Sequence, residues 1–421
     1  MKPQIRFKGF TDDWERSKIG EIVQFGKGHG YSKSDLQDKG EPIVLYGHMY
    51  TQYTSVIKDI KHYATLKENS ILSQGDEVII PSSGETPEDI SIASAIKLKN
   101  IIIGGDLNIL KFKKQLIDPS FAAVAITNSP THEELSKFAQ GKTIVHLRNS
   151  DISKGHISYP NIEEQICLSK YFETIEEYTS TINKKISSLK QIKSACLQSM
   201  FPQEGESVPK VRFKGFNEEW NTISFSEAFE FLRNNSLSRA ELAETGTVYN
   251  IHYGDILIKF GDCLFIEQDS DIPFIKDEKI ANKLISSSLI KNGDIIFADA
   301  AEDYTVGKCI EVITNQDNKI VSGLHTIPCR PTLQFASGYL GYYLNSNIFH
   351  NQLVGMIQGS KVCSISKKGL RTTHLIYPKD LAEQQKIASY FENLDQQISL
   401  QTQRLEKLKQ IKSACLDKMF V

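Results

Sequence analysis

The string LKQIKSACL occurs twice in this chain, at residues 189–197 and again at residues 408–416. A second block, PQIRFKGFTDDW at residues 3–14, returns as PKVRFKGFNEEW at residues 209–220. The two offsets are 219 and 206 residues, so the stretches between the repeated blocks differ in length by 13 residues. Because self-similarity at a long spacing is typical of a duplicated structural unit, the sequence predicts two halves built on one architecture.

The middles of the two halves share little beyond a few dipeptides. Gln140-Gly141 matches Gln358-Gly359, and Tyr159-Pro160 matches Tyr377-Pro378. Loops diverge where they touch different ligands, while the frame that carries them persists. We therefore interpret the chain as one scaffold with two different recognition faces. Duplication without a functional difference is the alternative, but it does not explain why the divergence is confined to the middles.

The repeat that ends each half reads as a long helix. Asn161 with Glu164, and Asp380 with Glu383, are cap and third-residue pairs in which we expect the cap to accept a backbone N–H and the Glu to reach back. Pro202 and the end of the chain close helices of roughly 38 residues, or about 57 Å at 1.5 Å per residue. The predicted heptad seam consists of Phe172, Ile175, Ile182, Ile186 and Leu189 in the first copy and Phe391, Leu394, Ile398, Leu405 and Leu408 in the second.

Two matched helices can hide their apolar stripes against each other. We predict an antiparallel pair within one polypeptide, with the halves related by a pseudo-two-fold axis and held at the two ends of a rod. A helix packed on its own domain, or paired with another chain, is the alternative. Cys196 and Cys415 are then small seam residues.

The predicted fold class is α+β, with two pseudo-symmetric mixed α/β domains separated by an antiparallel pair of long coiled-coil helices. Strands are expected at 42–50, 76–83, 92–98 and 106–112 in the first half and at 246–253, 293–300, 307–313 and 324–330 in the second. Helices are expected at 132–139 and 337–357. The expected organisation is a first domain at 1–160, a helix at 161–201, a linker at 202–208, a second domain at 209–379 and a helix at 380–421.

Composition limits the function classes. Basic residues number 49 and acidic residues 51, a net charge of −2, so the excess positive charge of a free-standing nucleic-acid binder is missing. Seven cysteines without a C-x-x-C pair fit reduced thiols, and no secretory leader or apolar run of about 20 residues is present, so we expect a cytoplasmic protein away from membranes.

Motifs of catalysis are absent from the sequence. SKFAQGKT at residues 136–143 lacks the first Gly of a phosphate-binding loop and follows a helical stretch, so we expect a turn there. Carboxylate clusters at Glu85, Glu88-Asp89 and Glu302-Asp303 are interpreted as solvated loop tips, and no metal site is expected. The chain therefore has the character of a binding protein.

The duplicated unit, with its Gln-Gly turn, Tyr-Pro, Glu-Gln at 164–165 and 383–384 and long heptad helix, resembles the specificity subunit of type I restriction-modification enzymes. The resemblance covers essentially the whole chain. It implies that each middle is a target recognition domain that reads one half of a bipartite site in double-stranded DNA. It also implies that the helices are the spacer and the docking surface for two methyltransferase subunits, which restriction/translocase subunits join. S-adenosylmethionine, ATP and Mg are then expected on those partner chains, with no cofactor on this one.

We chose candidate DNA contacts from loops that mix cations with groups able to hydrogen-bond base edges. An ordinary solvated role is the alternative for each. In the first half the candidates are Lys27, His29, Tyr31, Lys33, His48, Tyr50, Ser83, Glu85, Thr86, Lys142 and Arg148. In the second half they are His252, Tyr253, Asp299, Glu302, Asp303, Tyr304, Lys361, Lys367, Lys368 and Arg371.

Two rival functions stay open at this point. A coiled-coil adaptor with two protein- or ligand-binding heads would suit the near-neutral charge. An enzyme that hides a methyltransferase site in one middle would bind S-adenosylmethionine itself.

Overall fold

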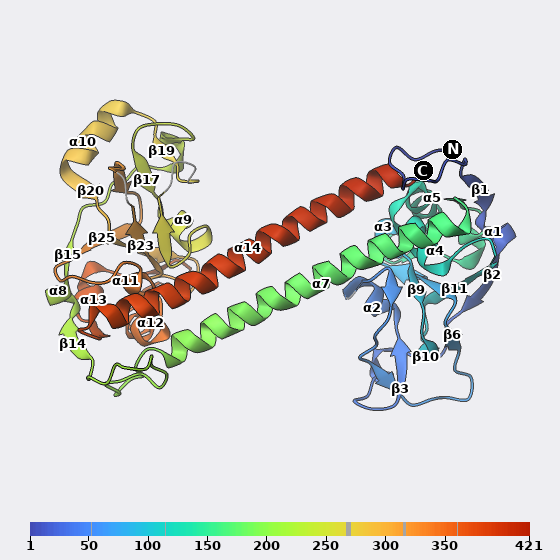
Figure 1. The fold of residues 1–421 in the computed structure, drawn as a ribbon, viewed down its shortest axis with the longest axis horizontal. Coiled ribbons are helices and arrows are strands. Elements are labelled where there is room, and N and C mark those ends of the chain that lie inside the picture. The colour runs from blue at the N-terminus through green and yellow to red at the C-terminus, as the bar shows by residue number, and fades with distance from the viewer. Residues whose placement is uncertain (52, 114, 267–270, 315–316, 360) are drawn as a thin grey trace. The chain divides into compact units, whose positions relative to one another are not determined.

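The structure is a computed structural model that describes residues 1–421 apart from 52, 114, 267–270, 315–316 and 360. The chain divides into two compact units (Figure 1). Unit 1 comprises Met1–Lys184 and Thr402–Val421, and unit 2 comprises Lys185–Gln401.

A five-stranded sheet forms the centre of unit 1, in the order β2 (Val23–Lys27), β11 (Leu107–Phe112), β7 (Glu77–Pro81), β9 (Ser94–Ile96) and β4 (Val56–Ile57). Its pairs are antiparallel except for β4 with β9. Every residue of β7 is buried, as expected for a strand covered on both faces. The helices α4 (Pro119–Asn128) and α5 (Pro130–Phe138) pack together, and α4 covers β7 and β9.

Smaller sheets and short helices complete unit 1. A four-stranded sheet has the order β5 (Tyr63–Ala64), β3 (Glu41–Val44), β10 (Lys99–Ile103) and β6 (Leu72–Gln74), and β1 (Glu15–Lys18) pairs with β13 (His156–Tyr159). The remaining elements before the first long helix are α1 (Ile19–Ile22), η1 (Lys33–Asp35), α2 (Tyr46–Thr51), β8 (Ser83–Gly84), α3 (Pro87–Ile90), β12 (Val145–His146) and α6 (Asn149–Ile152).

Unit 2 repeats this plan. Its main sheet has the order β15 (Phe229–Phe231), β25 (Thr326–Pro331), β21 (Ile295–Ala298), β23 (Cys309–Ile313) and β18 (Cys263–Phe265), again with one parallel pair at the end. A second sheet has the order β16 (Leu242–Ala243), β19 (Phe274–Ile275), β17 (Tyr249–Ile251), β24 (Ile320–Ser322) and β20 (Leu289–Ile290), and β14 (Asn221–Ser224) pairs with β27 (His374–Tyr377). The other elements are α8 (Phe225–Ala228), η2 (Arg239–Glu241), α9 (Tyr253–Ile258), α10 (Glu278–Ser288), β22 (Ala300–Ala301), α11 (Tyr339–Leu344), α12 (Asn347–Val354), β26 (Cys363–Ser364) and α13 (Lys367–Arg371).

Two long helices, α7 (Ile162–Ser199) and α14 (Leu381–Met419), each contribute to both units. In unit 1, Tyr171 Oη lies 3.4 Å from Cys415 Sγ, and Lys412 Nζ donates to Glu176 Oε1 at 2.8 Å. From Tyr171 to Glu176 the residue number in α7 rises, whereas the number of the partner in α14 falls from Cys415 to Lys412. The two helices are therefore antiparallel.

The same pairing recurs in unit 2 one repeat later. Cys196 Sγ lies 3.3 Å from Tyr390 Oη, and Lys193 Nζ donates to Asp395 Oδ1 at 2.6 Å. The predicted intramolecular antiparallel pair is therefore confirmed within each unit. The seam residues that we predicted are buried or half-buried in both helices.

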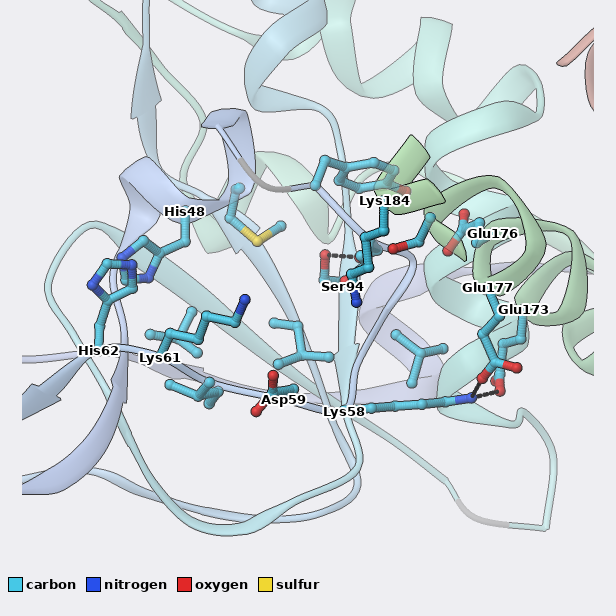
Figure 2. Close-up of a pocket in the computed structure, with 18 residues that line it drawn as sticks. His48, Lys58, Asp59, Lys61, His62, Ser94, Glu173, Glu176, Glu177 and Lys184 are labelled. Atoms are coloured by element: carbon cyan, nitrogen blue, oxygen red, sulfur yellow. Dashed lines mark hydrogen bonds and ion pairs between the residues drawn. The ribbon is translucent and has the colours of Figure 1, made fainter. Parts of the chain in front are cut away.

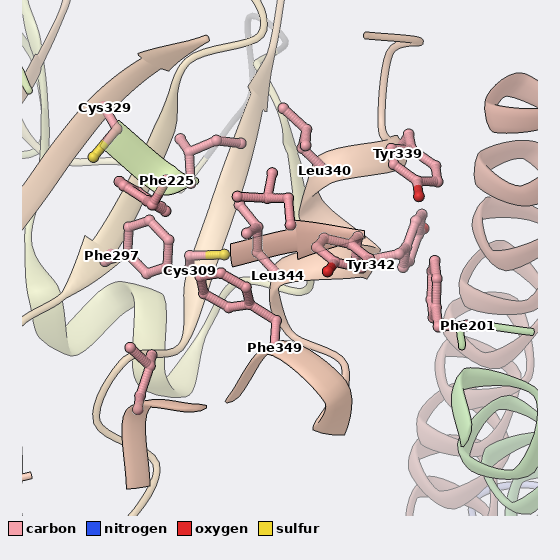
Figure 3. Close-up of a cluster of buried hydrophobic side chains, with 14 of the residues drawn as sticks. Phe201, Phe225, Phe297, Cys309, Cys329, Tyr339, Leu340, Tyr342, Leu344 and Phe349 are labelled. Carbon is pink, nitrogen blue, oxygen red and sulfur yellow. The ribbon is translucent and has the colours of Figure 1, made fainter. Parts of the chain in front are cut away.

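The long helices end in aromatic cores that they share with the repeated N-terminal block. Phe420, which follows α14, lies 6.0 Å from Trp14 and 5.7 Å from Phe172, measured between ring centroids in unit 1. In unit 2, Phe201 follows α7 and lies 6.3 Å from Trp220, and it packs beside the tyrosines of α11 (Figure 3). Each unit therefore contains the start of one long helix and the end of the other.

The first turn of each long helix differs from the prediction in one respect. The Glu164 N–H donates to Asn161 Oδ1 at 3.0 Å, as a cap requires. The Glu164 carboxylate, however, does not return to the cap but receives Arg6 Nε and Nη2, both at 2.6 Å. Arg212 makes the same bidentate bond to Glu383. A buried carboxylate gains more from a guanidinium than from one amide, so the repeated N-terminal block is tied to the helix start.

Several predicted strands are too long. Residues 46–50 belong to α2 and Tyr253 begins α9, because the Leu45 N–H donates to His48 Nδ1 at 3.1 Å and His252 caps α9. These local bonds stabilise a helical turn against the strand preference of aromatic residues. The expected helix at 337–357 is two helices, since the Asn345 side chain bonds Cys309 N and O in β23 and ends α11.

The helices α4 and α10 were missed. Their signals were present in the sequence, because Asp118 and Asp277 each cap a helix and Pro119 follows Asp118. The helix expected at 132–139 is confirmed as α5. The turn expected at 136–143 is confirmed for residues 139–143, because α5 ends at Phe138 and β12 begins at Val145, whereas Ser136–Phe138 still belong to α5.

No helix among the described residues is long and apolar enough to cross a membrane.

Candidate nucleic-acid interface

A short strand pair occupies the same place in both units. In unit 1, β8 pairs with β12, and Gln140 makes a further bridge to His146. In unit 2, β22 pairs with β26, and Gln358 bridges to Ser364. The Gln-Gly dipeptide noted in the sequence forms the tight turn before β12 and β26.

The glycine in this turn is required by geometry. Gly141 has φ +142°, and an added Cβ would lie 1.9 Å from the carbonyl oxygen of Ile144. Gly359 has φ +97°, and its Cβ would lie 2.0 Å from the carbonyl oxygen of Val362. The turn presents Lys142 in one unit and Lys361 in the other, and both lysines are exposed.

Several predicted contacts of the first half meet around an open cavity of about 810 Å³ beside β8. The Tyr50 hydroxyl donates to the Ser83 carbonyl oxygen at 2.8 Å, which ties α2 to β8. Burial raises the pKa of Tyr50, with the charge of Asp89 as the next cause, so the phenol is neutral. Glu85 also lines the cavity. Thr86 lies next to it and caps α3 by accepting the Asp89 N–H at 3.1 Å.

The loop at 27–33 is not part of this cavity. Tyr31 is 6% exposed and belongs to a core cluster, and its hydroxyl donates to the Thr65 carbonyl oxygen at 3.1 Å. Burial therefore removes Tyr31 from the surface that a duplex can reach, contrary to the role we predicted for it. Lys27, His29 and Lys33 are exposed, and Lys27 ends β2.

His48 lies in a second cavity of about 450 Å³, between the 53–62 segment and α7 (Figure 2). Its ring stacks on His62 with centroids 4.1 Å apart. Burial, and then the neighbouring His62, lowers the pKa of His48 to about 4, so the ring is neutral and accepts the Leu45 N–H. A neutral, half-buried ring cannot serve as the cation for a phosphate, and Lys58 across the cavity is paired with Glu173 and Glu177.

In unit 2 the corresponding surface is built from Asp299, His325 and Tyr253. His325 Nδ1 lies 3.2 Å from Asp299 Oδ1, and the Tyr253 ring lies 5.3 Å from the His325 ring. Burial raises the pKa of Asp299, while His325 opposes that shift. His252 is 6% exposed and uses Nδ1 to accept the Gly254 N–H, so it acts in the core and not at the surface as we predicted.

The remaining candidates of unit 2 lie on the loop after β22 and on α13. Tyr304 is 68% exposed, and Asp303 accepts the Thr305 N–H at 2.9 Å. Lys367 Nζ and the Arg371 guanidinium lie 5.6 and 5.4 Å from the Phe231 ring centroid, so α13 presents a cationic edge anchored on an aromatic ring. Glu302 and Lys368 are exposed, as is Arg148 of the first half, which precedes α6.

Comparisons with known proteins agree with this duplicated plan. The family model described as the type I restriction modification DNA specificity domain matches residues 11–191 and again 217–410. The chain belongs to this family. The two matches cover both halves of the sequence, so the duplication seen in the sequence is a duplication of this domain.

Solved structures share the fold of this type I specificity subunit. The S subunit of the type I restriction-modification system from M. genitalium is 16% identical, with a TM-score of 0.63 over 100% of this chain and 99% of that one. A chain from a structural study of complex assembly and conformational transition in a type I restriction-modification system is also 16% identical, with a TM-score of 0.52 over 97% of this chain and 98% of that one.

Sequence reasoning about this chain missed two residues beside the β8–β12 and β22–β26 pairs. Asp106 precedes β11 and His325 precedes β25, and their φ values are +57° and +54°. The Ser82 N–H donates to the Asp106 carbonyl oxygen at 2.8 Å, and the Asp299 N–H donates to that of His325 at 3.1 Å, so the positions are equivalent. Both residues lay within expected strands, and no sequence signal placed them in left-handed turns.

Proposed function

We propose that this chain is the non-catalytic DNA-specificity subunit that reads a bipartite target with two recognition domains. We further propose that it docks two methyltransferase subunits and, through them, restriction subunits. The observation that carries the proposal is that the two units share one architecture but place different side chains at equivalent surface positions. The cavity beside β8 offers carboxylates and tyrosines, whereas the surface beside β22 offers an Asp299–His325 pair and the cationic edge of α13.

Unlike faces on one frame suit a target whose two halves differ in base sequence. Base edges are distinguished by the donors and acceptors that they present in the major groove, so readers with different donors and acceptors select different bases. Lys361, Lys368 and Arg371 of unit 2 and Lys142 and Arg148 of unit 1 are exposed cations available for phosphates. Partner subunits would supply the rest of the phosphate contact, which accommodates the net charge of −2.

The docking of two identical partners is supported by the repeat itself. Lys190-Gln191-Ile192 and Lys409-Gln410-Ile411 have the same sequence and are exposed in both copies. Ile192 and Ile411 are 46% and 42% exposed, although an isoleucine on a helix surface gains by burial. A surface that stays identical while the recognition faces diverge fits one kind of partner bound twice. The partners would carry S-adenosylmethionine, ATP and Mg.

The test is reconstitution. The full chain is mixed with its cognate methyltransferase subunits and with a library of random duplexes, and the methylated or bound DNA is sequenced. A two-part sequence with a fixed gap is expected. Exchange of residues 221–375 for those of a relative should change one part only. Enrichment of no sequence would favour the adaptor, and firm binding of S-adenosylmethionine by the chain alone would contradict the assignment of methyl transfer to a partner.

A further inference from the structure

The groups that line the cavity beside β8 indicate which kind of base the first recognition domain selects, a point that the proposed function leaves unspecified. The cavity is bounded by the β8–β12 pair, by α2 and by the turn before β11. Its volume of about 810 Å³ and its open mouth leave room for the edge of a base pair. An exposed cation, Lys142, lies on the adjacent turn, next to Thr143 of the lining.

Aromatic rings line part of the cavity. Tyr46 and Tyr50 lie one helical turn apart in α2, with ring centroids 6.2 Å apart and an interplanar angle of 77°. Both rings are exposed at the cavity, at 41% and 36%. Because the Tyr50 hydroxyl donates to the Ser83 carbonyl oxygen, the ring is held in place and can contact the flat face or the methyl group of a base.

Hydrogen-bond acceptors also line the cavity. Among the described residues that line the cavity none is Lys or Arg, whereas Glu85, Glu88, Asp89 and Asp106 are present. Like charges repel, so this surface disfavours phosphate. Ionised carboxylates only accept hydrogen bonds. In the major groove the donors are the exocyclic amino groups N6 of adenine and N4 of cytosine.

Asp106 is the carboxylate of this set that stands at a backbone position shared by the two units. The bond from the Ser82 N–H to its carbonyl oxygen fixes its backbone beside β8. The equivalent residue in unit 2 is His325. A tyrosine begins the helix beside each of these positions: Tyr46 begins α2 and lines the cavity with Asp106, and Tyr253 begins α9 with its ring 5.3 Å from that of His325. One backbone position thus carries an acceptor-only group in one reader and an imidazole in the other.

We propose that Asp106, assisted by Glu85, is a specificity-determining residue of the first reader and accepts a hydrogen bond from the exocyclic amino group of an adenine or cytosine. The inference rests on the proposed function, since it assigns a base class to one of its two readers. His325 Nδ1 lies 3.2 Å from Asp299 Oδ1, so the proposal leaves Nε2 of His325 as the ring nitrogen that would contact the other half-site.

The experiment uses the full chain assembled with its methyltransferase subunits and a library randomised in both half-sites. Asp106→Asn keeps the size and the tolerance of a left-handed backbone while it replaces one acceptor oxygen with a donor. It should reduce the preference at one base pair of the first half-site by about 5- to 150-fold, which is the discrimination of one good base contact. His325→Asn should act on the second half-site only.

A matched control is Glu68→Gln, because Glu68 is an exposed carboxylate of the same unit that does not line the cavity. It should leave both half-sites unchanged. Glu85→Gln, on an exposed loop, repeats the test if Asp106→Asn fails to assemble. If the complexes with Asp106→Asn and with Glu85→Gln both select the same first half-site as the wild-type complex, this inference alone is overturned. A change in both half-sites by either variant would overturn it as well. If the wild-type complex enriches no DNA sequence from the library, the proposed function itself is overturned.

Discussion

The crossed ends of the long helices predict that each unit is stabilised by a phenylalanine from the other copy of the repeat. Phe420 is 7% exposed in the core of unit 1, and Phe201 is fully buried in the core of unit 2. Truncation of a buried Phe to Ala costs about 3–5 kcal/mol, because ring contacts are lost and a cavity remains. For units of this size each kcal/mol lowers Tm by roughly 2–4 °C.

The only two tryptophans of the chain report on the two cores separately. Trp14 lies 6.0 Å from Phe420, and Trp220 lies 6.3 Å from Phe201, between ring centroids. Neither indole N–H has a hydrogen-bond partner among the described residues, so Trp→Phe single-tryptophan chains lose packing but no hydrogen bond. Fluorescence-monitored thermal and urea unfolding then follows one unit at a time.

Phe420→Ala should shift the Trp14 transition, and Phe201→Ala should shift the Trp220 transition. Tyr178→Ala, on an exposed position of α7, is the control and should change neither by more than about 0.5 kcal/mol. If Phe420→Ala moved only the Trp220 signal, or moved neither, the end of α14 would not lie in unit 1. Equal shifts of both signals would mean that the two cores unfold as one, and the local assignment would be refuted.

Three further predictions use the same reporters or the reconstituted complex. Arg212→Ala should lower the free energy of unfolding of unit 2 by about 3–5 kcal/mol in urea titrations followed by Trp220, because Glu383 is 1% exposed and would be left unpaired; a loss below 1 kcal/mol would show that the pair is solvated. Burial raises the pKa of Glu311 to about 7, above its ordinary 4.5, so the native state holds a proton that the unfolded state releases between these values. The free energy of unfolding of unit 2 should therefore fall by up to about 1.4 kcal/mol per pH unit as the pH rises through that window. Glu311→Gln should abolish this slope in unfolding curves measured at several pH values, and an unchanged slope would contradict the assignment to Glu311. Ile192→Glu or Ile411→Glu should reduce the number of bound methyltransferase subunits from two to one, measured by light scattering, and the double variant should bind none; two subunits retained by the double variant would place the docking surface elsewhere.

The candidate surface was predictable only in part. Ser83, Glu85, Tyr50 and Lys142 were chosen as loop residues with useful donors and acceptors, and the fold brings them to one cavity or its rim. Tyr31 satisfied the same criterion but is buried, because its hydroxyl finds partners in a turn more than 30 residues away. Loop composition indicates which groups could bind, but it does not indicate which way they face.

The sequence by itself determined the two long helices with their caps and apolar seam, and the turn glycines, because each depends on residues close together in the chain. It also determined the duplication, because repeated blocks are recognised by comparison of the sequence with itself and require no knowledge of contacts. The tertiary structure decided the features that depend on distant partners. Glu164 bonds Arg6 and not its own cap, the end of α14 enters the core of unit 1, and Asp106 and His325 occupy equivalent left-handed turns. Buried charges and rings are stabilised by whichever partner the folded chain brings within contact distance, and that choice is made in three dimensions.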